Sequence, residues 1–142
     1  MKKFITAVFA FIAIASMTVL SSCGGSPSNE QIKEIVDRYD DGGGSNELND
    51  KDYDMLISYL EAAVNEALPL AKEIEKADEN DDYDKVKELN KKSEQLEEKY
   101  CELPGVLRIF NDVDEHEMGD ARYAKIEKLR DKLKKEGMTP GF

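Results

Sequence analysis

The sequence predicts an all-α protein, a bundle of three to four helices built on a long antiparallel helical hairpin. Apolar residues recur at three- and four-residue steps through most of the chain after residue 28, which is typical of amphipathic helices. The two longest such segments, 50–77 and 82–101, are separated only by Asp78–Asp82. A connection this short requires an antiparallel return.

The first predicted helix begins near Ser28. Ser28 and Gln31 form a capping-box pattern, in which each side chain pairs with the backbone of the other. Apolar residues then follow at helical spacing: Ile32, Ile35, Val36 and Tyr39. The three consecutive glycines at 42–44 predict a hinge or an exposed loop after this helix.

The longest predicted element runs from Asp50 to Ala77. As a helix it would be about 42 Å long. Its apolar positions are Leu56, Leu60, Ala63, Ala67, Leu70 or Ala71, and Ile74. Pro69 lies inside the segment, but the apolar stripe keeps its phase on both sides, so we expect one helix with a kink near Ala67 rather than two helices.

The return helix, over 82–101, has a narrower apolar seam with heptad spacing. Its members are Val86, Leu89, Ser93, Leu96, Tyr100 and Leu103. Cys101 follows this pattern beside Tyr100, so we expect a small buried hydrophobic residue. The alternative is an exposed thiol with a redox or cross-linking role.

Two more helices complete the predicted domain. The most apolar stretch, 106–113, indicates a short helix buried across the open end of the hairpin, with a brief strand as the alternative. The last helix places Tyr123, Ile126, Leu129 and Leu133 inward and ends at Gly137. Residues 122–135 hold seven basic residues against two acidic ones, so this helix packs beside the acidic hairpin or faces anionic headgroups.

The first 23 residues have the order of an export signal. Lys2 and Lys3 precede an apolar run from Phe4 to Leu20, which leads into Leu-Ser-Ser-Cys at 20–23. These four residues resemble the lipobox of bacterial lipoprotein precursors. The resemblance implies that residues 1–22 are removed and that Cys23 carries the lipid. Residues 23–28 would then be a tether and 29–142 a single helical domain.

Two alternatives to the lipoprotein interpretation are an ordinary secretory signal with a free Cys23 and an uncleaved membrane anchor. The seventeen residues from Phe4 to Leu20 are at the lower limit of the length that spans a bilayer. In the lipoprotein family, an Asp after the lipidated cysteine retains the protein at the inner membrane. Gly24 stands there, so we expect the outer membrane of the cell envelope, on a face that the sequence leaves open.

The charge of the chain limits its partners. Residues 23–142 contain 18 basic and 31 acidic residues, a formal charge of −13. We therefore expect no nucleic-acid binding, since phosphate recognition needs clustered Lys and Arg. The expected function is a non-catalytic interaction or accessory module that binds another envelope protein through an acidic helical surface. The alternative is an immunity or inhibitor lipoprotein that neutralises a basic toxin or enzyme.

Divalent-metal binding is the least favoured function. The pattern Asp50-x-Asp52-x-Asp54 resembles the start of a calcium-binding loop, but Met55 stands where that loop needs a turn residue. Asp78-x-Asn80-x-Asp82 fails in the same way. Asp112, His116 and Asp120 would share one face if their segment were a single helix. With one histidine and no phosphate loop, we expect no enzymatic activity and no cofactor.

Overall fold

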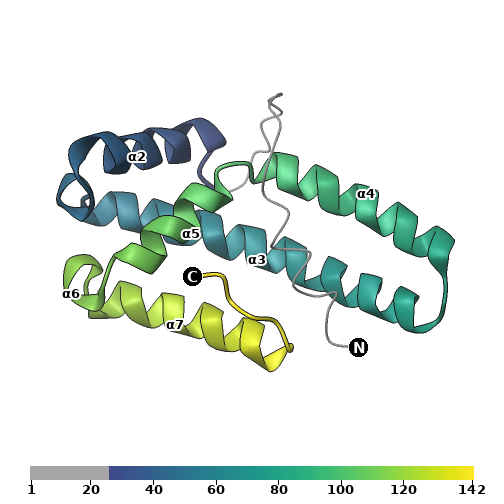
Figure 1. The fold of residues 1–142 in the computed structure, drawn as a ribbon. Coiled ribbons are helices and arrows are strands. Elements are labelled where there is room, and N and C mark those ends of the chain that lie inside the picture. The colour runs from purple at the N-terminus through teal and green to yellow at the C-terminus, as the bar shows by residue number, and fades with distance from the viewer. Residues whose placement is uncertain (1–25) are drawn as a thin grey trace.

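The computed structural model describes residues 26–142, so the predicted signal segment and Cys23 lie outside the described residues. The described part comprises α2 (Asn29–Gly42), a short 3-10 helix η1 (Ser45–Glu47), α3 (Asp50–Glu79), α4 (Tyr83–Lys99), α5 (Leu103–Asp112), α6 (Glu115–Met118) and α7 (Asp120–Lys135). No strand occurs in this range. The predicted all-α fold is confirmed (Figure 1).

The antiparallel pair of α3 and α4 is the predicted hairpin, and the end that carries its turn projects beyond the other helices (Figure 1). α3 continues through Pro69, which is exposed, so the interpretation of one helix rather than two is confirmed. The turn uses Asp81 in the left-handed region, at φ +54°, and the Asp82 carboxylate accepts from Lys85 N–H at 3.1 Å. Along α4 itself only Leu89 is fully buried, which agrees with the narrow predicted seam.

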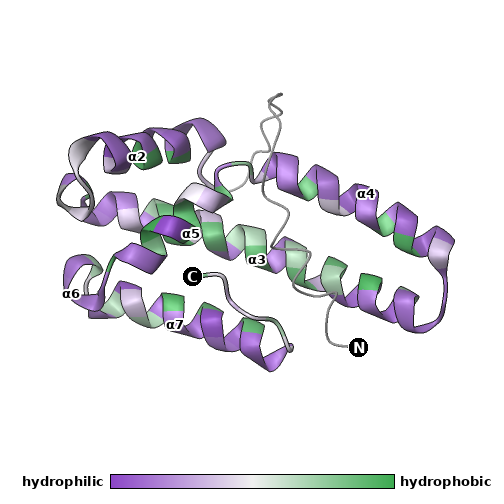
Figure 2. Cartoon of the chain, viewed as in Figure 1, coloured by the Kyte–Doolittle hydropathy of each residue, from purple (hydrophilic) through white to green (hydrophobic). Residues whose placement is uncertain are grey.

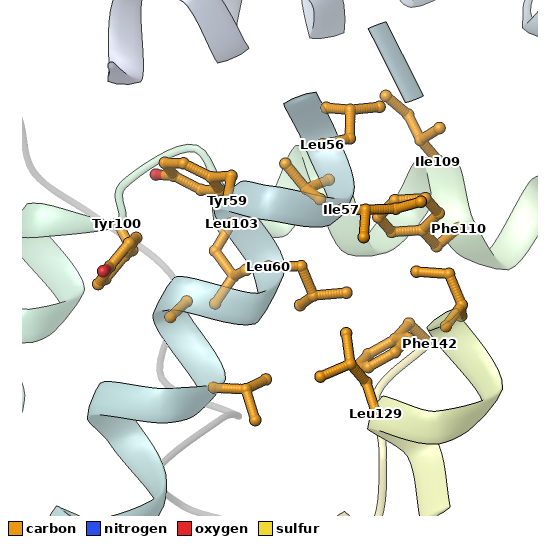
Figure 3. Packing of buried hydrophobic residues seen from close by; sticks show 14 of the residues in the cluster. Leu56, Ile57, Tyr59, Leu60, Tyr100, Leu103, Ile109, Phe110, Leu129 and Phe142 are labelled. Carbon is orange, nitrogen blue, oxygen red and sulfur yellow. The ribbon is translucent and has the colours of Figure 1, made fainter. Parts of the chain in front are cut away.

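α3 is the centre of the core, with α2, α5 and α7 packed around it. Figure 3 shows Leu56 and Ile57 of α3 facing Ile109 and Phe110 of α5, with Leu129 of α7 completing the cluster. In Figure 2 the apolar residues of α2, α3 and α5 face one another, while α4 and α7 present mostly hydrophilic surface. The buried short helix predicted at 106–113 is therefore confirmed as α5, and the strand alternative is wrong.

α2 and α5 approach each other closely at Gly105. A Cβ atom at this position would lie 2.7 Å from Cγ1 and 3.0 Å from Cγ2 of Val36, which is itself buried. Real Cβ atoms essentially never approach so closely. The glycine is thus needed for packing rather than for an unusual backbone angle.

Both ends of the chain that the structure describes are fixed to the fold. The capping box at Ser28 is confirmed, with Gln31 N–H donating to Ser28 Oγ at 3.3 Å and Ser28 N–H donating to Gln31 Oε1 at 3.0 Å. At the other end, the segment after α7 folds back and buries Met138 and Phe142. Arg130 Nε donates to the carbonyl oxygen of Phe142 at 2.9 Å.

Candidate interaction surface

The tether predicted at residues 23–28 joins the fold at the first turn of α2. Tyr59 of α3 donates its hydroxyl proton to Asn29 Oδ1 at 2.6 Å and accepts from the backbone N–H of Glu102 at 3.3 Å. One buried tyrosine therefore holds the start of α2 against α3 and the beginning of α5. The edge-on packing of Tyr59 against Tyr100, with ring centroids 5.2 Å apart, adds to this junction.

The outward side of α2 carries four exposed carboxylates at steps of four, three and four residues: Glu30, Glu34, Asp37 and Asp41. We call this set the α2 acidic face. It lies opposite the buried Ile32, Ile35 and Val36 and spans roughly 16 Å along the helix. A shallow, open depression beside it is also lined by Arg38 and Glu47.

The cations nearest this face leave most of its charge uncompensated. Lys33 pairs with Asp37 at 2.6 Å on the exposed surface. Glu30, Glu34 and Asp41 make no salt bridge with any residue in the range 26–142. Three of the four carboxylates are therefore available to a cationic partner.

Arg38 points away from the α2 acidic face and binds Asp52 of α3 with two hydrogen bonds, of 2.7 and 3.2 Å. Asp52 is only 6% exposed and also accepts from Asn49 N–H at 3.0 Å, which completes the capping box of α3. Burial opposes ionisation of this carboxyl, but the hydrogen bonds from Arg38 and Asn49 outweigh it and lower the pKa of Asp52. Asp52 thus acts as a structural anion between α2 and α3.

The basic helix α7 packs on α3, as one of the two interpretations predicted. Arg122 binds Asp54 with contacts of 2.9 and 3.1 Å and approaches Asp50 at 3.3 Å. At the other end of α7, Glu136 pairs with Lys72 of α3 at 2.7 Å. The prediction that α7 lies beside the acidic part of the hairpin is confirmed.

The residues of the two metal patterns around Asp52 and His116 are not arranged as a ligand cluster. Asp50, Asp52 and Asp54 lie within the first turns of α3, where Arg38 and Arg122 occupy the last two carboxylates. The single helix that would align Asp112, His116 and Asp120 does not form, because the chain is extended at Val113 and has φ +85° at Gly119. Within residues 26–142, no three His, Cys, Asp or Glu side chains are placed to hold a metal ion.

The prediction that Cys101 is buried is wrong. α4 ends at Lys99, and the chain turns so that Tyr100 enters the core while Cys101 faces outward. Partial desolvation, and then the neighbouring Glu102 carboxylate, raise the pKa of the thiol. An exposed thiol with a raised pKa is a weak nucleophile at neutral pH.

Among the described residues, the hydroxyl of Tyr53 is the one buried side-chain polar atom without a hydrogen-bond partner. Tyr53 is 2% exposed, and burial raises its pKa to about 12. The neighbouring Tyr39 donates instead to Asp112 Oδ2 at 3.3 Å. An unpaired buried hydroxyl costs stability, so Tyr53 is a weak point of the core.

Comparison with known proteins adds no further constraint on this surface. The chain matches no protein-family model, and no curated protein or solved structure is significantly similar to it. None of the helices in residues 26–142 is both long enough and apolar enough to cross a membrane.

Sequence reasoning identified an acidic helical surface but not its location. The spacing of Glu30, Glu34, Asp37 and Asp41 is the polar complement of the apolar stripe on α2, so this signal was present in the sequence. The pairing of Arg38 with Asp52 was not foreseeable, because it depends on how α2 packs on α3.

Proposed function

We propose that this chain is a lipid-anchored protein of the bacterial cell envelope that acts as a non-catalytic interaction module. The α2 acidic face would bind a basic surface of another envelope protein. The lipobox resemblance at residues 20–23 supports the anchor, which would be carried by Cys23. The arrangement of charges on α2 supports the binding role.

The observation that carries the proposal is the free charge on α2. Glu34 and Asp41 are exposed and make no salt bridge among the described residues, while the nearby Arg38 is committed to Asp52. A surface of one sign attracts the opposite sign and raises the association rate. The formal charge of −13 on residues 23–142 acts in the same direction.

The position of α2 in the fold also suits this role. The tether from Cys23 to Ser28 has a reach of at most about 17 Å, so α2 begins close to the headgroups to which the lipid is anchored. A partner of the α2 acidic face would therefore be a membrane protein or a protein held at the same surface.

The test is affinity capture of the lipidated protein from native membranes at low and high salt, followed by mass spectrometry. The double variant E34K/D41K reverses two unpaired charges on the face. E94K/E98K makes the same change in net charge on exposed positions of α4 and serves as the control. We expect a stoichiometric partner that the first variant loses and the control keeps.

Equal loss in both variants would mean that net charge, and not the α2 acidic face, determines binding. Capture of no protein by the wild type would contradict the proposed interaction. An inhibitor of a basic toxin or enzyme would use the same face, and its on-rate would fall steeply as the salt concentration rises. Salt-insensitive capture would exclude that alternative.

The anchor is tested separately. Replacing Cys23 by alanine should abolish incorporation of a radiolabelled or clickable fatty acid and leave the uncleaved precursor. Cys101→Ala is the matched control, since it removes the other thiol of the chain. A Cys23→Ala protein that still takes up the label would refute the lipid anchor.

A further inference from the structure

One side of α7 carries a second charged stripe, of opposite sign to that of α2. Lys125, Lys128, Lys132 and Lys135 follow at steps of three, four and three residues, and all four are exposed. They lie beside the buried Ile126, Leu129 and Leu133, about 110° around the helix from the centre of that buried side. We call these four residues the α7 lysine face, which spans about 15 Å.

The α7 lysine face has no carboxylate partner in the part of the chain that the structure describes. The salt bridges of α7 and its flanking residue Glu136 involve Arg122, Arg130 and Glu136, all outside the stripe. Lys132 donates to the amide oxygen of Asn65 at 2.7 Å, which leaves its charge unbalanced. In a chain that is acidic overall, four aligned lysines without partners form an unoccupied cationic surface.

α2 and α7 lie on opposite sides of α3 (Figure 1). Two helix-to-helix spacings of 8–10 Å place the axis of α7 about 18 Å from that of α2. The tether reaches at most about 17 Å and joins the chain at the start of α2, so α2 is the helix that the proposed lipid holds close to the membrane.

The α2 acidic face is opposite in charge to the α7 lysine face and similar to it in length, with successive charges about 4.5–6 Å apart along both. At 1.5 Å per residue the carboxylates stand at 0, 6, 10.5 and about 16 Å, and the lysines at 0, 4.5, 10.5 and 15 Å. We propose that copies of this chain associate with the α7 lysine face of one copy on the α2 acidic face of the next. The inference rests on the α2 acidic face being a binding surface, as proposed above.

Since the two faces are different surfaces, on helices that lie on opposite sides of α3, the contact is heterologous and forms open rows rather than closed dimers. Such rows are compatible with the tether when they run parallel to the membrane. Each exposed ion pair contributes little, so four pairs do not offset the cost of association in dilute solution. Confinement by lipid anchors raises the effective concentration, and salt at 0.15 M screens the repulsion between distant acidic regions.

The arrangement has a functional consequence. A row of copies covers the α2 acidic face of each member except the last. A basic partner must displace the α7 lysine face of a neighbour, so partner binding and row formation exclude each other at each site.

The test uses the full lipidated protein in liposomes, prepared as an equal mixture of ¹⁴N- and ¹⁵N-labelled chains. A carbodiimide joins lysines directly to carboxylates that are in contact. We expect mixed-isotope peptides that link the α7 lysine face to the α2 acidic face. Only a link between two chains produces a mixed-isotope peptide, and within one chain α2 and α7 lie on opposite sides of α3 (Figure 1).

The variants K125E/K128E and E34K/D41K should each lose these cross-links on their own. When the two variants are mixed, links between the two substituted faces should appear. K85E/K87E makes the same change in charge as K125E/K128E on exposed positions of α4 and should keep the wild-type pattern.

Absence of α2–α7 links in the wild type, or their persistence in K125E/K128E, would overturn the inference. Links from the α7 lysine face to another protein would do the same. The proposed function is tested independently of row formation. K125E/K128E leaves the α2 acidic face intact and should still capture the partner that E34K/D41K loses.

Discussion

Substitution of Gly105 by alanine tests the closest helix contact in the fold. The new methyl group would meet the two methyl groups of Val36 at 2.7 and 3.0 Å, against an ordinary contact distance of about 3.5–4.0 Å. Val36 is 7% exposed and lies on the buried side of α2, so its methyl groups have no free space to enter without a shift of that helix. Overpacking of this kind costs about 1–3 kcal/mol.

The opposing term is helix propensity, since alanine in place of glycine within α5 stabilises by at most about 1 kcal/mol. The overpacking term is larger, and we expect Gly105→Ala to lower the free energy of unfolding by about 1 kcal/mol. Urea unfolding followed by circular dichroism at the helical band measures this difference. Gly141→Ala is the control, because the nearest atom to its methyl group would be Leu107 Cδ1 at an ordinary contact distance of 4.0 Å.

The double variant with Val36→Ala identifies the cause. Val36→Ala alone should cost roughly 2 kcal/mol through lost burial and the resulting cavity. The double variant should lose less free energy of unfolding than the two single variants lose together, since the smaller side chain at position 36 makes room for the new methyl group. A Gly105→Ala protein more stable than the wild type, or strictly additive costs, would refute the packing argument.

Three further predictions concern single side chains. Tyr53→Phe removes an unpaired buried hydroxyl and should leave the free energy of unfolding unchanged or raise it by up to about 1 kcal/mol. Tyr59→Phe breaks two hydrogen bonds and should lower the free energy of unfolding by roughly 1–2 kcal/mol. Urea unfolding measures both differences. Because the pKa of Asp52 is lowered in the folded state, its stabilising effect is present above the unfolded pKa of about 3.9 and is lost as the pH falls through the lower folded value. Asp52→Asn should therefore flatten the acid limb of the stability curve. Cys101 should react completely with a thiol reagent in the folded protein, and its rate should rise with pH over a higher range than that of an ordinary cysteine, because its pKa is raised.

Each of these expectations has a clear contrary result. A destabilised Tyr53→Phe protein would mean that the hydroxyl has a partner such as a bound water. An unchanged acid limb in Asp52→Asn would show that the contact with Arg38 does not link stability to pH. Protection of Cys101 until the protein unfolds would contradict its exposed position.

Local elements of the fold were predictable from short-range patterns. The capping box of Ser28 with Gln31 marked the start of α2, and the continuous apolar phase across Pro69 marked α3 as one helix. These features depend on residues within one or two turns of each other, where helix geometry fixes which side chains meet. Cys101 shows the limit of the same reasoning, since the three-residue turn after α4 exposes a residue that was expected to be buried from its place beside Tyr100.

The candidate interaction surface was predictable in part. The sequence contained the acidic spacing on α2 and the basic excess of α7, and it favoured packing of α7 beside the hairpin over a helix that faces the headgroups. The ion pairs of Arg122 with Asp54 join α7 to the hairpin across a separation of 68 residues. The close approach of Gly105 to Val36 and the return of Phe142 to the core were likewise absent from any local pattern.

The sequence by itself determined the all-α class, the long hairpin and the apolar side of each major helix, because hydrophobic periodicity requires those sides to be buried. Only the tertiary structure decided which charges remain free. Arg38 pairs with the buried Asp52 and Arg122 with the hairpin. Three of the four outer carboxylates of α2, and the four lysines of the α7 lysine face, make no salt bridge among residues 26–142. Whether a charge is neutralised depends on the packing of helices distant in sequence, and that packing placed the two unpaired stripes on opposite sides of α3.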